Sequence, residues 1–187
     1  MNTTNTAEKY PRKTEAFGNA FAWLHSMVYA WVICIFLFTF AGRHITVNGT
    51  SMIPTLHDRD HLIISDFIYT PKHGDVVVVR KLTFNDEPIV KRIIAMEGQT
   101  VDIDFDTGTV YVDGVELDEP YINERMERTY TTIEFPLTVP ESHIFVMGDN
   151  RNRSADSRDP RIGLIDEADI LGKAYVIIWP IKNIRLL

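Results

Sequence analysis

Ile89-Val90-Lys91-Arg92-Ile93-Ile94-Ala95 is the stretch that decides the fold of this 187-residue chain. Its branched apolar residues predict a short buried β-strand with two cations in the middle. In a strand, Lys91 shares its face with Ile89, Ile93 and Ala95. An ammonium group packed against aliphatic neighbours loses solvation, which lowers its pKa and allows it to act as a neutral base. The alternative is that Lys91 lies near a strand end and extends its ammonium to water.

Other short apolar runs, each bounded by turn residues, extend this prediction to a chain that is mainly β. They cover residues 61–65, 75–80, 101–105, 109–112, 115–117, 143–147 and 174–179. Asp113-Gly114 is a strong turn signal between two of them. So many short strands predict an antiparallel sheet or a barrel-like fold. Residues 102–142 are expected to form a smaller β-rich insertion or cap.

Composition excludes several classes of protein and site. The net charge of −7 and the pI near 5.3 argue against non-specific binding to nucleic acid, which needs a basic face. The single cysteine, Cys34, excludes an internal disulfide framework and a zinc site built on paired thiolates. We therefore expect no metal, no other cofactor and no nucleic-acid partner. The mean hydropathy of −0.08 is an average over two unlike parts of the chain.

The first of these parts is an uncharged N-terminal segment. Residues 16–42 include no Asp, Glu, Lys or Arg over 27 positions. About 20 apolar residues span a bilayer as a helix, so the segment predicts a transmembrane anchor over residues 20–42. The flanking Lys9, Arg12 and Lys13 favour a cytoplasmic tail over residues 1–19, which would place residues 43–187 outside the cytoplasm. The alternative is a cleaved signal peptide with Thr39-Phe40-Ala41 as its cleavage site.

A candidate nucleophile follows the anchor within nine residues, in Gly49-Thr50-Ser51-Met52-Ile53-Pro54-Thr55. Gly permits a sharp turn and Pro fixes φ, so this segment can hold Ser51 on a rigid bend. Backbone N–H groups on such a bend can stabilise an oxyanion. An ordinary Ser/Thr-rich turn would have the same composition.

A third segment, residues 148–158, follows an apolar strand and is rich in Arg and Asp. It is not a calcium loop, because Arg151 and Arg153 stand where oxygen ligands are required. A packed network of Asp and Arg side chains that shapes a site is the alternative to a solvated loop. The six histidines are scattered, so the sequence leaves both a Ser/Lys dyad and a Ser/His/Asp triad open.

These segments, in this order, resemble the type I signal peptidases, in particular the short single-anchor form of Gram-positive bacteria. The resemblance covers residues 20–187 and is carried by segments 49–56, 74–78, 90–98, 119–122 and 148–158. It implies a membrane-bound serine endopeptidase that cleaves signal peptides from exported preproteins after a small residue, in an Ala-x-Ala pattern. The implied partners are preprotein signal peptides, the lipid bilayer of the cell membrane and the secretion translocon.

The resemblance also implies the role of each site residue. Ser51 is the expected nucleophile, Lys91 the general base and Ser154 the residue that orients the lysine. Asp156 and Arg158 match a supporting ion pair, and the oxyanion hole uses the Ser51 N–H. In some members of the family a second oxyanion donor is a hydroxyl two residues upstream, where this chain has Gly49. The positions that match its small substrate pockets are Val47, Met52 and Val90.

Two other classes of protein remain as alternatives. The self-cleaving repressors of the DNA-damage response use a related Ser/Lys fold, but they have a DNA-binding module where this chain has its apolar segment. A catalytically silent, membrane-tethered protein could instead bind signal peptides or assemble with an active paralogue.

Overall fold

A computed structural model of the chain describes residues 12–40, 42–80, 87–127 and 131–187, and within the first range the side chains of residues 20–35. The chain divides into two compact units, Met1–Ala41 and Gly42–Leu187. Residues 1–11 of the predicted tail, Ala41 of the predicted anchor and residues 128–130 of the predicted cap lie outside the described residues.

The described part of the first unit is a single helix, α1 (Arg12–Phe40). Two of its polar side chains are hydrogen-bonded to carbonyls one turn earlier, His25 Nδ1 to Phe21 O at 2.8 Å and Ser26 Oγ to Ala22 O at 3.0 Å. Within the described part of the chain, no helix combines the length and the apolar character that crossing a membrane requires. The anchor over residues 20–42 stays a prediction.

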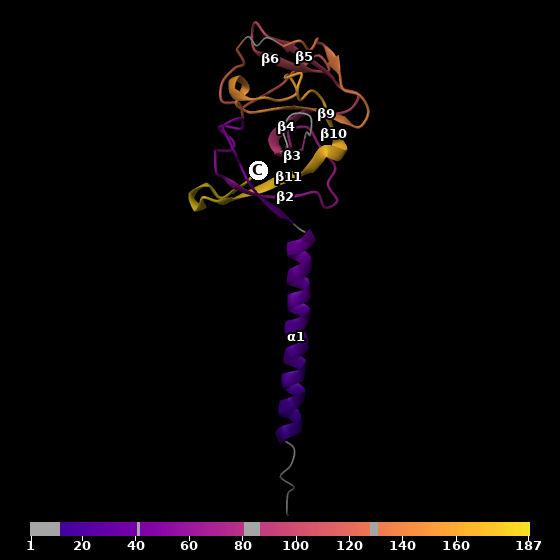
Figure 1. The fold of residues 1–187 in the computed structure, drawn as a ribbon, viewed down its shortest axis with the longest axis vertical. Helices are drawn as coiled ribbons and strands as arrows, with labels where there is room; N and C mark the ends of the chain where they lie inside the picture. Colours follow the sequence, from indigo (N-terminus) through magenta and orange to yellow (C-terminus); the bar gives the residue numbers. More distant parts are fainter. Residues whose placement is uncertain (1–11, 41, 81–86, 128–130) are drawn as a thin grey trace, which may run out of the picture. The chain divides into compact units, whose positions relative to one another are not determined.

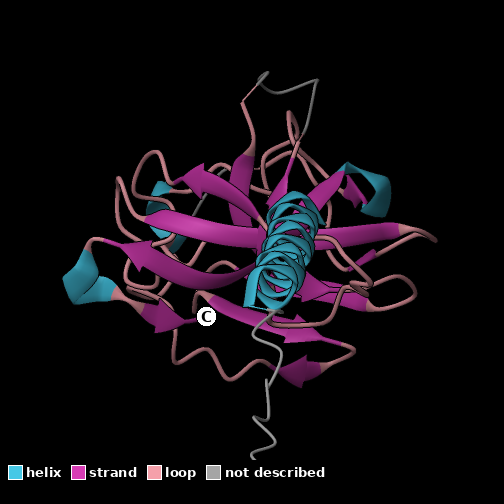
Figure 2. Cartoon of the chain, turned by 90° about the horizontal axis from the view of Figure 1, so that it is seen from below, coloured by secondary structure: helices cyan, strands magenta, loops and turns pink. Residues whose placement is uncertain are grey.

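The second unit is built mainly from strands, with helical structure limited in its described part to three short 3₁₀ turns (Figure 2). Its larger sheet has the strand order β1-β2-β11-β3-β4-β9-β10, with β12 paired to β11, and every pairing is antiparallel. The strands are β1 (Arg43–Thr46), β2 (His61–Ser65), β3 (Val76–Val79), β4 (Ile89–Ala95), β9 (His143–Met147), β10 (Ile165–Asp166), β11 (Ile170–Trp179) and β12 (Arg185–Leu186). Since this order has two ends, the described strands form an open sheet.

A smaller antiparallel sheet lies at one end of this unit, above β4, β9 and β10 in Figure 1. Its order is β7-β6-β5-β8, from β5 (Thr100–Asp104), β6 (Thr109–Val112), β7 (Val115–Glu116) and β8 (Leu137–Thr138). Asp113 and Gly114 have φ values of 52° and 76°, which is the left-handed pair that a tight hairpin needs between β6 and β7. Phe135 packs edge-on against Phe145 of β9, which joins the small sheet to the large one.

Strand β3 forms a wall through the core because all four of its valines are buried. Val76 and Val78 face one apolar cluster together with Met52 and Leu56. Val77 and Val79 face the opposite cluster together with residues of β4 and β9. A strand covered on both faces reads as a continuous run of branched residues, and this explains the run of four valines.

The predicted mainly β, antiparallel fold is confirmed. The predicted ranges 61–65, 89–95, 109–112 and 143–147 match β2, β4, β6 and β9 in full. Strand β11 begins at Ile170, four residues earlier than predicted. One detail about the lysine's neighbours was wrong, since a register shift between Ile93 and Ala95 moves Ala95 into the cluster under the small sheet.

Candidate active site

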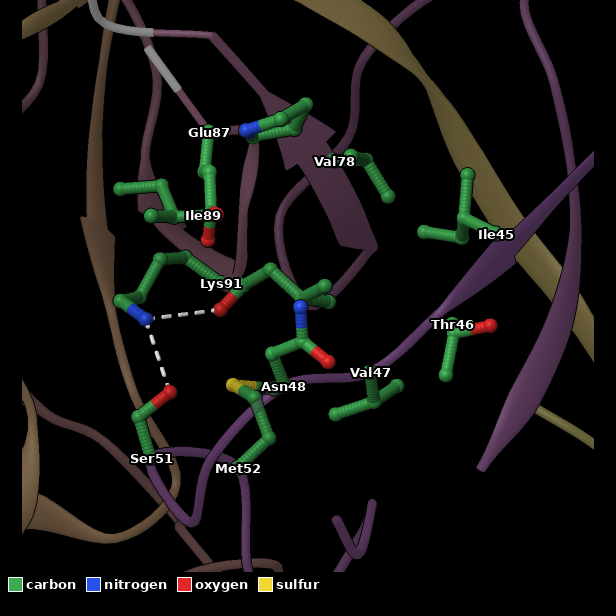
Figure 3. Close-up of a pocket in the computed structure, with 12 residues that line it drawn as sticks. Ile45, Thr46, Val47, Asn48, Ser51, Met52, Val78, Glu87, Ile89 and Lys91 are labelled. Atoms are coloured by element: carbon green, nitrogen blue, oxygen red, sulfur yellow. Dashed lines mark hydrogen bonds between the residues drawn. The ribbon is translucent and has the colours of Figure 1, made fainter. Parts of the chain in front are cut away.

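The structure brings Ser51 and Lys91 together across 40 residues of sequence (Figure 3). Lys91 Nζ lies 2.9 Å from Ser51 Oγ and donates a second hydrogen bond to the Val90 carbonyl, also at 2.9 Å. A hydroxyl and an amine at this distance have the geometry for direct proton transfer.

Ser51 stands on the turn that leaves β1, and both ends of this turn are fixed. Gly49 has a φ of +95°, a value that favours glycine, and its N–H donates to Asp58 Oδ1 at 2.8 Å. After the serine, Met52 and Leu56 are fully buried in the apolar cluster under β3. The nucleophile is therefore half-buried, on a turn whose neighbours belong to the core.

The loop after β9 closes against the same turn. Asn150 N donates to the Ser51 carbonyl and Asn150 Nδ2 to the Thr50 carbonyl, both at 3.0 Å. Gly148 packs so closely that a Cβ on it would lie 2.5 Å from Ser51 O and 2.3 Å from Ser154 Oγ. Only glycine fits at residue 148 without moving the serine.

Lys91 is buried in the middle of the sheet, with 3% of its surface exposed. Desolvation lowers the pKa of its ammonium from 10.5 to about 8. The carboxylates of Asp156 and Asp149 act in the opposite direction, and Arg158 adds to the lowering. Of the two alternatives for Lys91, the structure shows burial rather than extension into water, and the result is an amine that is partly neutral near physiological pH.

Asp156 and Arg158 form a buried ion pair behind the lysine. Arg158 Nε and Nη2 donate to the two carboxylate oxygens at 2.8 Å each, and Gly148 N donates to Asp156 Oδ2 at 2.9 Å. Burial opposes ionisation of Asp156, but the hydrogen bonds and charge of Arg158 outweigh it and hold the pKa of that carboxyl below its usual value. The pair thus fixes the loop that contacts the nucleophile turn.

Ser154 lies beside this pair without a hydrogen bond to Lys91. Its hydroxyl is buried and has no hydrogen-bond partner within the described part of the structure. It is nevertheless close enough to Asp156 to help lower the pKa of that carboxyl. Orientation of the lysine by Ser154 stays a prediction.

A second buried network was missed from the sequence. The Asp149 carboxylate accepts hydrogen bonds from Arg92 and from Thr55, a residue of the nucleophile turn. Tyr121 covers the Arg92 guanidinium, which lies 4.1 Å from its ring centre. Burial and the neighbouring Glu119 raise the pKa of Tyr121 to about 12, so it stays neutral. The only sign of this network in the sequence is that Arg92 directly follows the candidate base Lys91.

Ser51 and Lys91 lie in a groove of about 450 Å³. The three residues that match the family's substrate pockets, Val47, Met52 and Val90, line this groove. The backbone N–H of Ser51 has no acceptor among the described residues, so it is free to contact a ligand. A Cβ on Gly49 would meet no atom of the described residues within 4 Å, its chain neighbours aside, so the space there is open.

The histidines do not assemble a triad in the described structure, since none of them hydrogen-bonds to Ser51. His44 pairs with His61 at 2.7 Å, while His73 and His143 contact backbone carbonyls. Within the described ranges, no group of three His, Cys, Asp or Glu side chains is placed to hold a metal ion.

Comparisons with known proteins identify the family of the chain. The family model "Signal peptidase, peptidase S26" matches residues 20–179. Signal peptidase I of Bacillus licheniformis is 34% identical, over 93% of this chain and 96% of its own length. Signal peptidase I S of Bacillus subtilis is also 34% identical, over 87% and 91%. A solved signal peptidase I from Enterococcus faecalis is 33% identical, with a TM-score of 0.48 over 57% of this chain and 97% of that one. The family model and the two Bacillus relatives show that the chain belongs to the signal peptidase family, peptidase S26.

Proposed function

We propose that this chain is a membrane-anchored serine endopeptidase that removes N-terminal signal peptides from exported preproteins, with Ser51 as nucleophile and Lys91 as general base. The observation that carries this proposal is the 2.9 Å contact between Lys91 Nζ and Ser51 Oγ inside an open groove. The lowered pKa of Lys91 supports it, because a base must be neutral to accept the hydroxyl proton.

The reaction proceeds through an acyl-enzyme. Neutral Lys91 accepts the Ser51 proton while Oγ attacks the scissile carbonyl, and the carbonyl π electrons move onto its oxygen. The Ser51 N–H stabilises the resulting oxyanion. When the tetrahedral intermediate collapses, the C–N bond breaks and Lys91 gives its proton to the leaving amine. A water molecule then attacks the ester with Lys91 again as base, which releases the signal peptide and regenerates Ser51.

Substrate selection follows from the shape of the groove. Strand β4 and the segment after β1 form its two walls, so an extended peptide can lie between them (Figure 3). Val47, Met52 and Val90 leave shallow apolar space beside Ser51, which suits alanine-sized side chains. This is the basis for an Ala-x-Ala preference before the scissile bond.

The membrane arrangement rests on the sequence. We assign residues 1–19 to a cytoplasmic tail, 20–42 to a single transmembrane anchor and 43–187 to an extracytoplasmic peptidase domain with a cap over about 102–142. The support is the absence of Asp, Glu, Lys and Arg over residues 16–42. Ser51 follows this segment by nine residues, which limits its reach to roughly 30 Å from the end of the anchor. Such a tether brings the enzyme to the bilayer and to the translocon, where preproteins emerge.

The test uses the detergent-solubilised full chain and one Ala-x-Ala preprotein. Ser51→Ala and Lys91→Ala should each abolish processing while the circular dichroism spectrum of the folded protein is retained. Labelling of the unsubstituted chain, but not of Ser51→Ala, by a serine-directed acylating inhibitor would exclude a silent binding protein. Full activity of Lys91→Ala would overturn the dyad, as would loss of chemistry in a folded histidine variant.

A further inference from the structure

We infer that Glu87 selects substrates by charge, favouring a basic and rejecting an acidic side chain about four residues before the scissile bond. This inference rests on the proposed function, since it concerns the substrate of the same groove. It concerns a side chain that takes no part in the Ser51–Lys91 contact.

Glu87 and the reacting pair line the same groove. Glu87 and Pro88 lead directly into β4, so the wall of the groove runs without interruption from Glu87 to Lys91. In Figure 3 the Glu87 side chain lies beside Ile89 and extends toward the Lys91 end of this wall. Among the described residues that line the groove, Glu87 carries the only carboxylate and Lys91 the only cation.

The Glu87 carboxylate is available to a ligand. The side chain is exposed, and it forms no hydrogen bond or ion pair with any described residue. By contrast, the buried carboxylates near the base, Asp149 and Asp156, are both paired with arginines. The charges that act on Lys91 are those of Asp156, Arg158 and Asp149, so Glu87 does not tune the base.

The spacing identifies the substrate position. A strand advances about 3.3 Å per residue, and β4 begins only at Ile89, so the backbone of Glu87 lies at most roughly 13 Å from that of Lys91 along the wall. A peptide lying extended beside β4 advances at the same rate, so the residue that it presents to Glu87 is about the fourth from the scissile bond. The pockets proposed for the Ala-x-Ala residues lie in this groove, so the residue concerned is on the signal-peptide side.

The expected size of the effect is that of an exposed ion pair. Attraction of a lysine and repulsion of a glutamate both raise the ratio of kcat/KM for the Lys peptide to that for the Glu peptide. Each of the two effects changes kcat/KM by less than about tenfold in water. We expect a roughly three- to tenfold preference for lysine over glutamate, which weakens as ionic strength rises.

The experiment compares three peptides that differ only at the fourth residue before an Ala-x-Ala site, with Lys, Gln or Glu there. The kcat/KM of the full chain in neutral detergent is measured at low and at 0.5 M salt. Glu87→Gln should bring the Lys/Glu ratio close to one, and Glu87→Lys should invert it. Glu116→Lys makes the same charge change on exposed strand β7 and should keep the original ratio.

Each result has a distinct meaning. An unchanged Lys/Glu ratio in Glu87→Lys would overturn the inference, as would a ratio near one in the unsubstituted chain at low salt. If the Gln peptide is not cleaved by the unsubstituted chain, the proposed function itself fails. A ratio that shifts equally in Glu116→Lys would show a long-range effect of net charge and would also overturn the role of Glu87.

Discussion

The guanidinium of Arg92 holds the carboxylate of Asp149 through two hydrogen bonds, 2.8 Å from Nε and 2.6 Å from Nη2. Arg92 follows Lys91 on β4, and Asp149 precedes Asn150, which contacts the nucleophile turn. Thr55 of that turn donates to the same carboxylate. The pair therefore joins the strand of the base to the two segments that hold the serine.

Removal of one partner of this pair should be strongly destabilising. Asp149→Ala leaves the Arg92 guanidinium, which is only 11% accessible, without its carboxylate partner, and this costs roughly 3–5 kcal/mol of unfolding free energy. Urea titration of the purified chain measures this loss. Asp66→Ala removes an exposed pair, in which Arg43 and Asp66 are 61% and 51% accessible, and should change stability by less than about 1 kcal/mol. Equal losses in the two variants would contradict this account.

The pH dependence of cleavage should report the lysine. With a pKa of about 8, Lys91 is protonated and inactive as a base at lower pH. Therefore kcat/KM should rise about tenfold per pH unit below 8 and level off above it. Cleavage of a peptide without ionisable side chains, measured from pH 5.5 to 9.5, gives the profile. A midpoint near 6.5 would instead indicate a histidine.

Stability should respond to the same ionisation. The pKa of Lys91 is about 8 in the folded chain and near 10.5 when exposed, so below pH 8 the folded state bears the full cost of a buried charge. Lys91→Met should raise the unfolding free energy by about 1–3 kcal/mol at pH 7. This gain should shrink as the pH rises from 8 to 10.5, because stability of the unsubstituted chain increases across that window. A gain that is constant with pH would contradict the burial of the ammonium.

Substitution of Gly148 should lower activity because it displaces Ser51. A Cβ there would lie 2.5 Å from the Ser51 carbonyl, so Gly148→Ala must displace the nucleophile turn. We expect kcat to fall by about a hundredfold, since small displacements of reacting groups have effects of this size. Gly98→Ala places its Cβ in open space and serves as the control for replacing a glycine without a steric clash. A comparable fall in kcat for Gly98→Ala would remove the steric explanation.

Local patterns predicted the strands that have clear boundaries. Strands β2, β4, β6 and β9 are apolar runs bounded by turn residues, and their limits follow from this. Strands β8, β10 and β12 have two residues each, too few to show any alternation. Strand β1 is Arg-His-Ile-Thr, which has no apolar pattern, and it is a strand because β2 offers a free edge.

The candidate site was only partly predictable for a related reason. Burial of Lys91 follows from its neighbours along β4, which any sequence window includes. The Arg92–Asp149 pair joins residues 57 positions apart, and the pattern of residues within a short window cannot predict such a contact. The shift of Ala95 out of the lysine's face comes from a bulge against β9, which depends on the partner strand rather than on β4 itself.

The strand order also has a consequence for biosynthesis. Strand β11 separates β2 from β3, so the segment that bears Ser51 is joined to the strands that bear Lys91 through residues 170–179. A chain still being translated has made the serine and the lysine long before it has made this central strand. We expect the nascent protein to stay proteolytically silent until β11 inserts between β2 and β3. Acylation of arrested chains that end before residue 170 would contradict this order of assembly.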